Sequence, residues 1–503
     1  MARNYRTPGV YVEEISKLPP SVAQVETAIP AFIGFTQKDS YNGLSLLNRP
    51  RRIRSLNDFE DVYGLPAHSR YTNQANPANG IRVTQDGNGN FVLDGPIHDP
   101  FDNLQFRMYY CLQMYFANGG GPCYIVSCGK YEDASFLNAT AMDNALTALR
   151  KEDEPTMILF TDAASLSKTD FYSLYTKALA QSAELMDRVV IIDVYPDLTT
   201  ATRLIDFKAG RLDLNYATGS GTLADDFRTS IGNNNLSYGA AYFPWFKTTL
   251  PYYTDESLLT VTSAISPLDT VTVLRKYPQP GETDVENPQE SLYHVNSQLY
   301  SLIKKEMDRF RVILPPSSSA AGVYATVDST RGVWKAPANV SLNFVREVMV
   351  KIDDQDQQDM NVTSTGKSIN AIRFFTGKGT LVWGARTLAG NDNEWRYISV
   401  RRFYNMVEES VKKASGVFVF EPNDANTWVK VRTMIENFLI LQWRAGALMG
   451  SKPDEAFFVR VGLGQTMTAL DILEGKMIVE IGMAVVRPAE FIILRFSHKM
   501  VNA

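Results

Sequence analysis

The sequence has few of the side chains that bind metals or form disulfides. Its 503 residues include four histidines and three cysteines: His68, His98, His294 and His498, and Cys111, Cys123 and Cys128. No two histidines stand at a metal-ligand spacing. The cysteines are odd in number and too few for a disulfide framework. A metal site at Cys123 and Cys128 would need remote carboxylates, so we expect buried, reduced thiols, no bound metal and no cofactor.

Long apolar runs and an excess of basic residues are also missing. No apolar run is long enough to span a bilayer, and the start MARNYRTPG has no apolar segment after its basic residues. We therefore expect neither membrane insertion nor Sec export, and we expect the chain to be made in the cytoplasm. The formal net charge is −5, whereas a nucleic-acid-binding domain normally carries a basic excess. With 45% hydrophobic residues, the chain can form several soluble globular domains.

Catalytic and phosphate-binding motifs are incomplete. No serine lies in a G-x-S-x-G elbow, and residues 377–380 (GKGT) lack the spacing of a phosphate loop and instead predict the turn of a hairpin. Residues 462–464 lack the third glycine of a dinucleotide-binding fingerprint. Asp162 and Asp193 end two adjacent predicted strands, where open α/β sheets bind ligands. One hypothesis is an α/β hydrolase-like enzyme that uses these carboxylates; helix capping or loop hydrogen bonding is the favoured alternative.

Each end of the chain predicts an isolated strand. Residues 10–15 (VYVEEI) are β-branched, aromatic and acidic, and they lie between a turn at 7–9 and a proline pair at 19–20. Proline on both sides excludes a tight hairpin, so the backbone groups of this strand must pair with a distant segment or with another molecule. Residues 476–481 and 490–496 (EFIILRF) are strand-like as well. Both termini are therefore predicted to be connectors.

The middle of the chain predicts an α/β fold. Residues 156–160 and 188–194 read as buried strands joined by a helix at 168–186. Such a βαβ unit has a right-handed crossover and implies a parallel sheet that is covered on both faces. The flanking elements predicted from the same kind of pattern are strands at 28–35, 123–126 and 237–246 and helices at 103–116, 141–150 and 290–309.

Two regions depart from this pattern. Residues 64–103 are rich in Asn, Gly, Asp and Pro, and their weak periodicity predicts a loop-like surface insertion. From about Trp334 onward the chain changes to shorter helices and strands, which is typical of a separate α+β domain. Within it, we expect Thr466 to cap a short helix that ends at Gly475.

Several segments together carry a family resemblance. They are residues 5–15 (YRTPGVYVEEI), 20–22, 25–27, 31–34 (AFIG), 116–126 (FANGGGPCYIV), 334–339 (WKAPAN), 382–388 (VWGARTL), 395–402 (WRYISVRR), 419–423 (VFEPN), Trp428, 446–448 and 487–492 (RPAEFI). In these segments the chain resembles the contractile tail sheath proteins of phage tails and phage-tail-like contractile injection systems. The resemblance covers both ends and most of the chain, and it is weakest over 40–105 and 200–290.

The resemblance implies a multidomain α/β and α+β fold with extended strand arms at both ends. The middle region would be subtilisin-like but without protease activity, because the chain has no G-T-S-M-A nucleophile motif and no histidine in an H-G-T setting. The expected division is an N-terminal β-arm at 1–20, the N-terminal part of the core at 21–63 and 104–130, a surface insertion at 64–103, the α/β domain at 131–333, the C-terminal α+β sheath domain at 334–488 and a C-terminal β-arm at 489–503.

The implied function is structural. Sheath subunits polymerise as stacked hexameric rings around an inner tube and contract to drive the tube through a target membrane. The implied partners are further copies of the chain, the inner tube protein, and baseplate and terminal cap proteins, with no nucleic acid and no direct membrane insertion. Assembly would occur in the bacterial cytoplasm, and a phage tail, a released injection particle and a membrane-anchored system all fit. A tail fibre would instead predict repeats and a β-rich composition.

The resemblance also implies where subunits touch. The arms of neighbouring subunits would add strands to one another's sheets. The arm residues are Val10, Tyr11, Val12, Glu13, Glu14 and Ile15 at one end and Phe491, Ile492, Ile493, Leu494, Arg495 and Phe496 at the other. A helix of the C-terminal domain would hold the tube by charge, with Asp471, Glu474 and Lys476 as the contacting residues. The alternative is a core-packing helix, given its apolar Met467, Leu470 and Leu473.

Overall fold

The computed structural model describes residues 21–75, 79–131, 137–196, 198, 201–210, 222–276 and 288–495. Over these ranges the chain divides into two compact units. The smaller unit contains residues 21–25 and Met406–Val486, and the larger unit contains residues 26–405 and 487–495. The boundary near residue 405 lies inside helix α11 (Ile398–Ser415). Residues 334–405, which the sequence assigns to the C-terminal sheath domain, thus belong to the larger unit.

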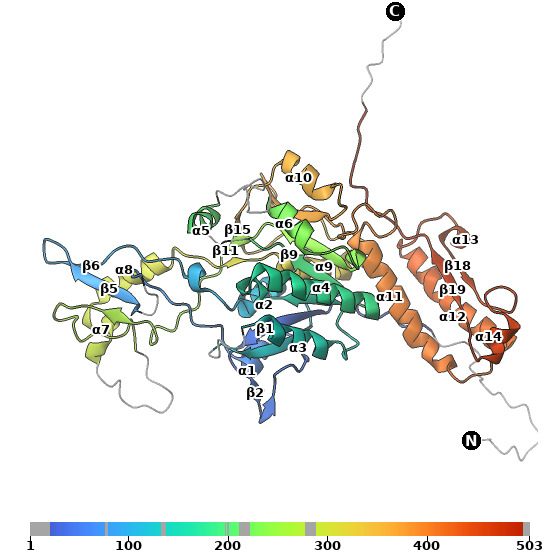
Figure 1. The fold of residues 1–503 in the computed structure, drawn as a ribbon, viewed down its shortest axis with the longest axis horizontal. Helices are drawn as coiled ribbons and strands as arrows, with labels where there is room; N and C mark the ends of the chain where they lie inside the picture. Colours follow the sequence, from blue (N-terminus) through green and yellow to red (C-terminus); the bar gives the residue numbers. More distant parts are fainter. Residues whose placement is uncertain are drawn as a thin grey trace, which may run out of the picture. The chain divides into compact units, whose positions relative to one another are not determined.

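Over the described ranges, a nine-stranded sheet forms the centre of the larger unit (Figure 1). Six neighbouring strands run parallel in the order β7-β1-β8-β9-β10-β16, and antiparallel strands complete both edges. Continuous apolar strands of this kind are buried on both faces, so the predicted α/β sheet is confirmed. The strands are β1 (Pro30–Thr36), β4 (Arg51–Ile53), β7 (Cys123–Lys130), β8 (Met157–Phe160), β9 (Val189–Asp193), β10 (Gly239–Phe243), β14 (Val340–Ser341), β16 (Ile369–Phe375) and β17 (Gly379–Val382).

Helices cover both faces of this sheet. The ring of Phe32 on β1 packs against Tyr115 of helix α2 (Met108–Ala117). The next residue, Ile33, points to the other face and pairs in register with Phe160 of β8. Phe160 packs against Tyr175 of helix α4 (Lys168–Leu185). Since side chains alternate along a strand, α2 and α4 lie on opposite faces.

Local capping explains where several helices begin. Helix α3 (Ala139–Leu149) starts after Asn138 and α4 starts after Ser167, and both side chains accept a backbone N–H of the first turn. The predicted βαβ unit is confirmed as β8, α4 and the parallel strand β9. The other helices of the core are α1 (Leu56–Tyr63), α5 (Ala201–Lys208), α6 (Leu223–Ser230), α9 (Ser317–Arg331) and α10 (Asp354–Asn361), with short 3₁₀ helices η2 (Pro100–Asn103), η4 (Ala163–Ser165) and η5 (Leu236–Tyr238).

The helix predicted at 103–116 begins later than expected. Asp99 caps the 3₁₀ helix η2, and α2 starts only at Met108. The backbone N–H of Arg107 donates to a carboxylate oxygen of Asp162, at 2.5 Å. Asp162, which follows the distant strand β8, therefore defines this helix start, and no local pattern could indicate it.

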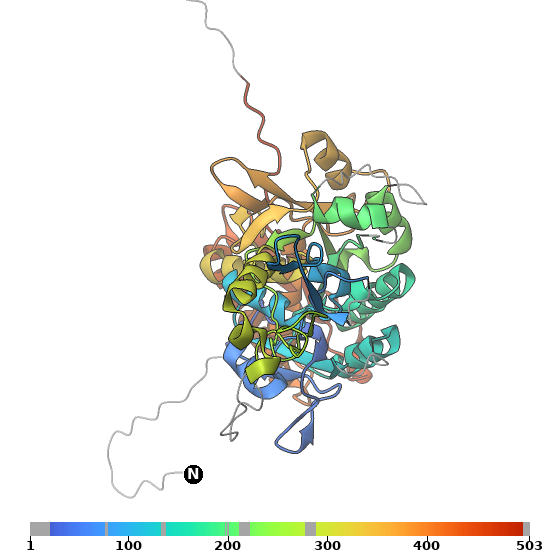
Figure 2. The ribbon, with the colours of Figure 1, turned by 90° about the vertical axis from the view of Figure 1, so that its left-hand side faces the viewer.

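The predicted insertion at 64–103 is not simply loop-like. Strands β5 (Ile81–Gln85) and β6 (Phe91–Leu93) form a hairpin, and β12 (Val261–Thr262) pairs with β5 in parallel. Ile81 and Val83 are buried while Arg82 is exposed, so the strand has one inward face. Figure 1 shows this sheet at the left, and Figure 2 shows it in front of the central sheet.

The single helix predicted at 290–309 is divided in two. Helix α7 (Leu292–Val295) ends at Asn296, whose side chain then caps α8 (Ser297–Met307) by accepting the N–H of Leu299 at 3.0 Å. A strong capping residue inside an apolar repeat thus overrides the repeat. The 3₁₀ helix η6 (Pro288–Glu290) precedes α7.

Two small sheets complete the larger unit. Strands β11 (Phe246–Thr248), β13 (Ile313–Leu314) and β15 (Val345–Val348) are antiparallel. Strands β2 (Ser40–Tyr41) and β3 (Leu44–Ser45) form a hairpin whose two turn residues, Asn42 and Gly43, both have positive φ, as a two-residue turn requires. The hairpin predicted around residues 377–380 is confirmed as β16 and β17.

The smaller unit is an α+β structure. Helix α12 (Ala425–Arg444) buries Val431, Ile435 and Phe438 on one face. The other elements are the end of α11, η7 (Gly416–Phe418), α13 (Pro453–Ala456), β18 (Phe457–Arg460), α14 (Ala469–Leu473) and β19 (Glu480–Met483). Across the residues described in both units, no helix has the length and apolar character needed to cross a membrane.

Candidate assembly surfaces

The C-terminal arm exposes four successive large apolar side chains. Phe491, Ile492, Ile493 and Leu494 retain 69%, 79%, 76% and 72% of their accessible surface. Residues 491–495 belong to no strand, and no hydrogen bond joins them to other described residues. An extended apolar segment with unpaired backbone groups is a template for pairing with another chain. The other predicted arm residues, 10–15 and Phe496, lie outside the described residues.

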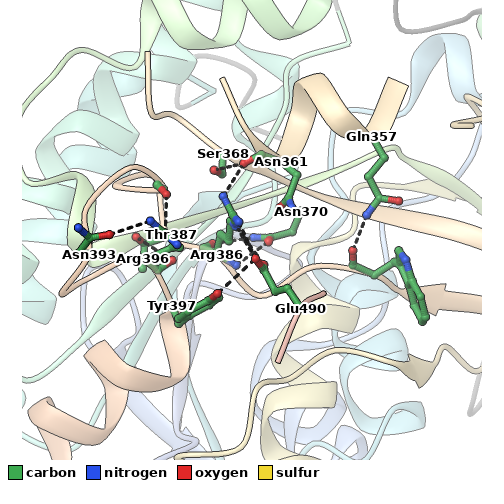
Figure 3. Close-up of polar contacts among 12 residues, drawn as sticks. Gln357, Asn361, Ser368, Asn370, Arg386, Thr387, Asn393, Arg396, Tyr397 and Glu490 are labelled. Atoms are coloured by element: carbon green, nitrogen blue, oxygen red, sulfur yellow. Dashed lines mark hydrogen bonds and ion pairs between the residues drawn. The ribbon is translucent and has the colours of Figure 1, made fainter. Parts of the chain in front are cut away.

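The root of this arm is fixed by a buried ion pair. Arg386 is almost fully buried and binds both carboxylate oxygens of Glu490, with 2.9 Å from Nε to Oε1 and 2.5 Å from Nη2 to Oε2 (Figure 3). The hydroxyl of Tyr397 donates to Oε2 of Glu490 at 3.2 Å, and Nη1 of Arg386 donates to the carbonyl of Asn361 at 2.9 Å. A side-on bidentate pair of this kind fixes both the position and the orientation of the carboxylate.

The segment that follows the N-terminal arm is also held by hydrogen bonds. In the smaller unit the N–H of Val25 donates to the hydroxyl of Ser410 at 3.1 Å. In the larger unit Thr27 donates to Asp328 at 2.6 Å, and Arg402 donates to the carbonyl of Thr27 at 2.8 Å. The described chain therefore begins as an anchored segment.

Among the described residues, the sheet of the smaller unit has two strands. β18 and β19 pair antiparallel from Phe457 with Met483 to Arg460 with Glu480, and neither has a second strand partner among the described residues. A two-stranded sheet is marginal alone, and its outer edges present unpaired N–H and C=O groups. This sheet is a suitable acceptor for an added strand.

Of the predicted tube-contact residues, Asp471 lies half-buried on helix α14, and Glu474 and Lys476 are exposed just after it. Thr468 and Asp471 cap the helix reciprocally, and these hydrogen bonds lower the pKa of Asp471. Lys476 and Glu474 form an ion pair at 2.6 Å. The expectation that Thr466 caps this helix is wrong, because its hydroxyl instead donates to the carbonyl of Ile478 at 2.6 Å.

The core-packing alternative for α14 does not hold over the residues described. None of residues 469–473 is buried, and Leu470 and Leu473 are 63% and 84% exposed, although Met467 before the helix is buried. Asn423, in the turn between α11 and α12, donates to the carbonyl of Lys476 at 3.0 Å and so lies beside the end of α14. The same turn exposes Phe420 completely, with φ of +71°, which is rare for a bulky residue. We call Phe420, Leu470 and Leu473 the apolar tip.

The two carboxylates considered for catalysis are buried and fully engaged. Asp162 accepts the N–H groups of Phe35 and Arg107, and Asp193 accepts the N–H and hydroxyl of Ser317 at 2.9 and 2.6 Å. Burial raises the pKa of Asp162 to about 6 and that of Asp193 to about 7. Their oxygens serve as structural acceptors at strand ends, which is the capping and loop role preferred from the sequence.

The cysteines are packing residues in the described chain. Cys111, Cys123 and Cys128 are buried and unpaired, and desolvation raises the pKa of each thiol. Among the residues described, no three His, Cys, Asp or Glu side chains are grouped so that they could hold a metal ion.

Comparison with known proteins finds matches to tail sheath proteins. The family model for the phage tail sheath C-terminal domain matches residues 390–499. The tail sheath protein of Enterobacteria phage T4 is 24% identical over 139 residues, 27% of this chain and 21% of that protein. The tail sheath protein of Burkholderia phage BcepMu is 29% identical over 143 residues, 27% of this chain and 30% of that protein. The matches thus span less than a third of these relatives.

Solved structures match over nearly the whole chain. A chain in the cryo-EM structure of the anti-feeding prophage baseplate is 28% identical, with a TM-score of 0.60, over 99% of this chain and 100% of that chain. The sheath complex of an extracellular contractile injection system called PVC, in its contracted state, is 27% identical, with a TM-score of 0.59, over 99% of each chain. These relatives are contractile sheath proteins of phage tails and extracellular injection systems.

The fold and the C-terminal domain define the class as a multidomain α/β sheath subunit. Residues 390–499 thus match the phage tail sheath C-terminal domain, and nearly the whole chain is similar to contractile tail sheath proteins, as the resemblance in its sequence motifs predicted. Its relatives are structural proteins rather than enzymes.

Sequence reasoning missed the pairing of Arg386 with Glu490. Both residues lie in segments that carry the family resemblance, 382–388 and 487–492, and each is charged within an apolar context. Their separation of 104 positions gives no local pattern by which to connect them. The opposite charges of these two residues were the feature of the sequence from which the pairing could have been suspected.

Proposed function

We propose that this chain is the sheath subunit of a contractile particle. It polymerises as stacked hexameric rings around an inner tube and contracts to drive the tube through a target membrane. The observation that carries this proposal is the match, over 99% of the chain, to the contracted sheath complex of an injection system. The exposed arm at residues 491–495 supplies what such an assembly needs, a segment that no other described residue covers.

Strand addition joins neighbouring subunits in this proposal. The N-terminal strand at 10–15 and the C-terminal strand at 491–496 of adjacent copies add to the free edges of β18 and β19. Main-chain hydrogen bonds give such joints affinity without requiring a fixed body-to-body contact. Subunits can then rotate and slide during contraction while their sheets stay joined. Because the contacts are heterologous and do not close on themselves, they produce an open helical assembly.

In this proposal the surface around α14 contacts the inner tube. Asp471, Glu474 and Lys476 are the proposed charged contacts; Glu474 and Lys476 are exposed in the described chain and Asp471 is half-buried. The apolar tip beside them adds Leu470, Leu473 and Phe420, which would be covered on binding. Single exposed ion pairs are weak, but every ring repeats them.

The remaining partners follow from the same assembly. The baseplate and a terminal cap protein bind the two ends of the sheath, and no nucleic acid takes part. The chain carries no enzymatic activity and binds no metal or cofactor in this role. Assembly takes place in the bacterial cytoplasm, and phage tails, released particles and membrane-anchored systems remain alternatives. The subtilisin-like assignment of the middle region is part of this proposal, as are the domain limits given above, except that the C-terminal domain begins near residue 406 rather than at 334.

Electron microscopy tests the proposal directly. Purified full-length chain, alone and co-expressed with a tube protein from a neighbouring gene, is examined by negative stain. The expected result is rings or tubes, with long extended tubes only when the tube protein is present. Monodisperse particles in both samples, at concentrations where related sheaths polymerise, would contradict it.

A further inference from the structure

We propose that Glu490 is the fixed end of the C-terminal arm, clamped by Arg386 so that the arm always leaves its own subunit from one point and in one direction. The proposal goes beyond strand exchange itself and rests on the proposed assembly only for its consequence in polymers. The arm is positioned by Glu490, Arg386 and Tyr397, and strand pairing alone would not require such a role for these residues.

The backbone of Arg386 is hydrogen-bonded to a strand of the central sheet. Its backbone N–H donates to the side-chain oxygen of Asn370 at 2.7 Å, and its carbonyl accepts the side-chain nitrogen of the same residue at 2.8 Å. Asn370 lies on β16 and also donates to the carbonyl of Ala241 on β10, at 3.0 Å. The backbone of the residue that binds Glu490 is therefore attached to β16 (Figure 3), and through Asn370 to β10.

The carboxylate completes a site that would otherwise hold an uncompensated charge. The side chain of Arg386 is 3% exposed and that of Glu490 is 18% exposed. A buried guanidinium without its partner is strongly unfavourable, so the pair resists separation. The phenol of Tyr397 adds a third donor to the same carboxylate.

Glu490 is the last described residue of the arm that is hydrogen-bonded to the rest of the described chain. Immediately after it come the apolar residues 491–494, for which the described chain offers no hydrogen-bond partner. The nearest preceding attachment is the N–H of Val486, which donates to the carbonyl of Ala447 at 3.1 Å and belongs to the smaller unit. Loss of the clamp would thus lengthen the free segment and transfer its root from one compact unit to the other.

Loss of the clamp should weaken donation of the arm as a strand to a neighbouring subunit, and this effect can be measured. The effective concentration of a tethered segment falls with the length of its free tether. A clamped root also prevents the strain of sliding subunits from pulling residues 487–489 away from the body. The clamp therefore keeps the donated strand in reach of its acceptor before and during rearrangement.

The first measurement uses the isolated chain and does not depend on assembly. Nitroxide labels are attached to cysteines introduced at Lys378 and Ile492, both exposed residues of the larger unit. The native cysteines are buried with raised thiol pKa values, so they should not be labelled. In Glu490→Gln the width of the inter-label distance distribution should rise at least about twofold. Glu394→Gln, an exposed glutamate nearby, is the matched control and should leave the width unchanged.

The second measurement concerns polymers. With folded protein verified by circular dichroism, Glu490→Gln and Arg386→Lys should raise the critical concentration for sheath formation about tenfold. Glu490→Asp, which keeps the charge, should restore part of the difference. Equal distance distributions in Glu490→Gln and Glu394→Gln would overturn the clamp, whether or not polymers form. A wild-type chain that never polymerises would contradict the proposed function instead, while the label experiment would still decide on the clamp.

Discussion

Arg402 and Asp328 form a buried ion pair, with 2.5 Å between Nη2 and Oδ2, in which both side chains are nearly inaccessible to solvent. Asp328 lies on α9 and Arg402 on α11, so the pair joins two helices far apart in sequence. The same two side chains hold the hydroxyl and the carbonyl of Thr27. The pair thus holds together three parts of the larger unit, one of them the segment that follows the N-terminal arm.

Removing one member of this pair should destabilise the larger unit. Asp328→Asn leaves the guanidinium of Arg402 buried without its counter-charge, and breaking buried pairs costs about 3 to 5 kcal/mol. Denaturant unfolding followed by circular dichroism measures the loss. The control is Asp354→Asn, whose carboxylate pairs with Arg373 but is 91% exposed. That variant should change the free energy of unfolding by less than about 1 kcal/mol, and equal losses in both variants would contradict the role of burial.

The buried carboxyl group of Asp193 should make the free energy of unfolding depend on pH. Burial raises its pKa from 3.8 to about 7 in the folded chain, so the folded state keeps a proton that the unfolded state releases above about pH 4. Stability from this group is therefore greatest at low pH and declines as pH rises towards 7. Relative to Asp193→Asn, the wild type should lose up to about 1 kcal/mol per pH unit between pH 5 and 7 and then level off.

The measurement is a series of unfolding curves for both proteins across that pH range. Other carboxylates contribute equally to both and cancel in the difference. Asp269→Asn, which removes an exposed carboxylate, is the control and should give a flat difference. A difference that increases in favour of the wild type with rising pH would have the wrong sign for a buried, protonated Asp193.

The sequence predicted the framework better than the details that position the surfaces. The parallel sheet and the βαβ unit followed from continuous apolar runs such as residues 189–192, which a parallel sheet buries on both faces. The start of α2 could not be predicted, because it is bound by Asp162, a residue far away in the sequence that follows strand β8. The cap of α14, in contrast, could have been predicted from the sequence. Thr468 is followed three residues later by Asp471, which is the pattern of a capping box, whereas Thr466 is followed at that distance by Ala469.

The pairing of Arg386 with Glu490 shows why other features of the structure could not be predicted from the sequence. Tertiary pairing of Arg386 with Glu490 depends on how the chain returns to the larger unit after Val486. No periodicity encodes that return. Exposure of Leu470 and Leu473 was equally hidden, because their spacing is the same as that of a core-facing helix.

Deletion of residues 1–20 should separate folding from assembly. The deleted chain still begins before Val25, whose N–H donates to Ser410, so the described contacts of the smaller unit are retained. We expect folded monomers with native circular dichroism that do not form tubes, since one strand donor is lost. Sedimentation and negative-stain microscopy measure the outcome. An unfolded product would mean that the strand at 10–15 pairs within its own subunit.

Charge reversal on α14 should weaken binding of the inner tube. With Asp471 and Glu474 both changed to lysine, tube-templated extended sheaths should become rarer, while contracted sheaths should still form because these do not require the tube. Each exposed charge contributes little, but the loss is repeated in every subunit of a ring. Counting extended and contracted particles in micrographs of sheath co-expressed with tube protein provides the measurement.

This variant needs a control because Asp471 also caps α14 through Thr468. Thr468→Ala removes the cap without changing any charge, and capping residues contribute about 1 kcal/mol. If charge is responsible, Thr468→Ala should retain extended particles that the double lysine variant loses. If both lose them, helix formation is the requirement, and Leu473→Ser would then test whether the apolar tip carries the contact. Normal extended particles from the double lysine variant would exclude Asp471 and Glu474 as tube contacts.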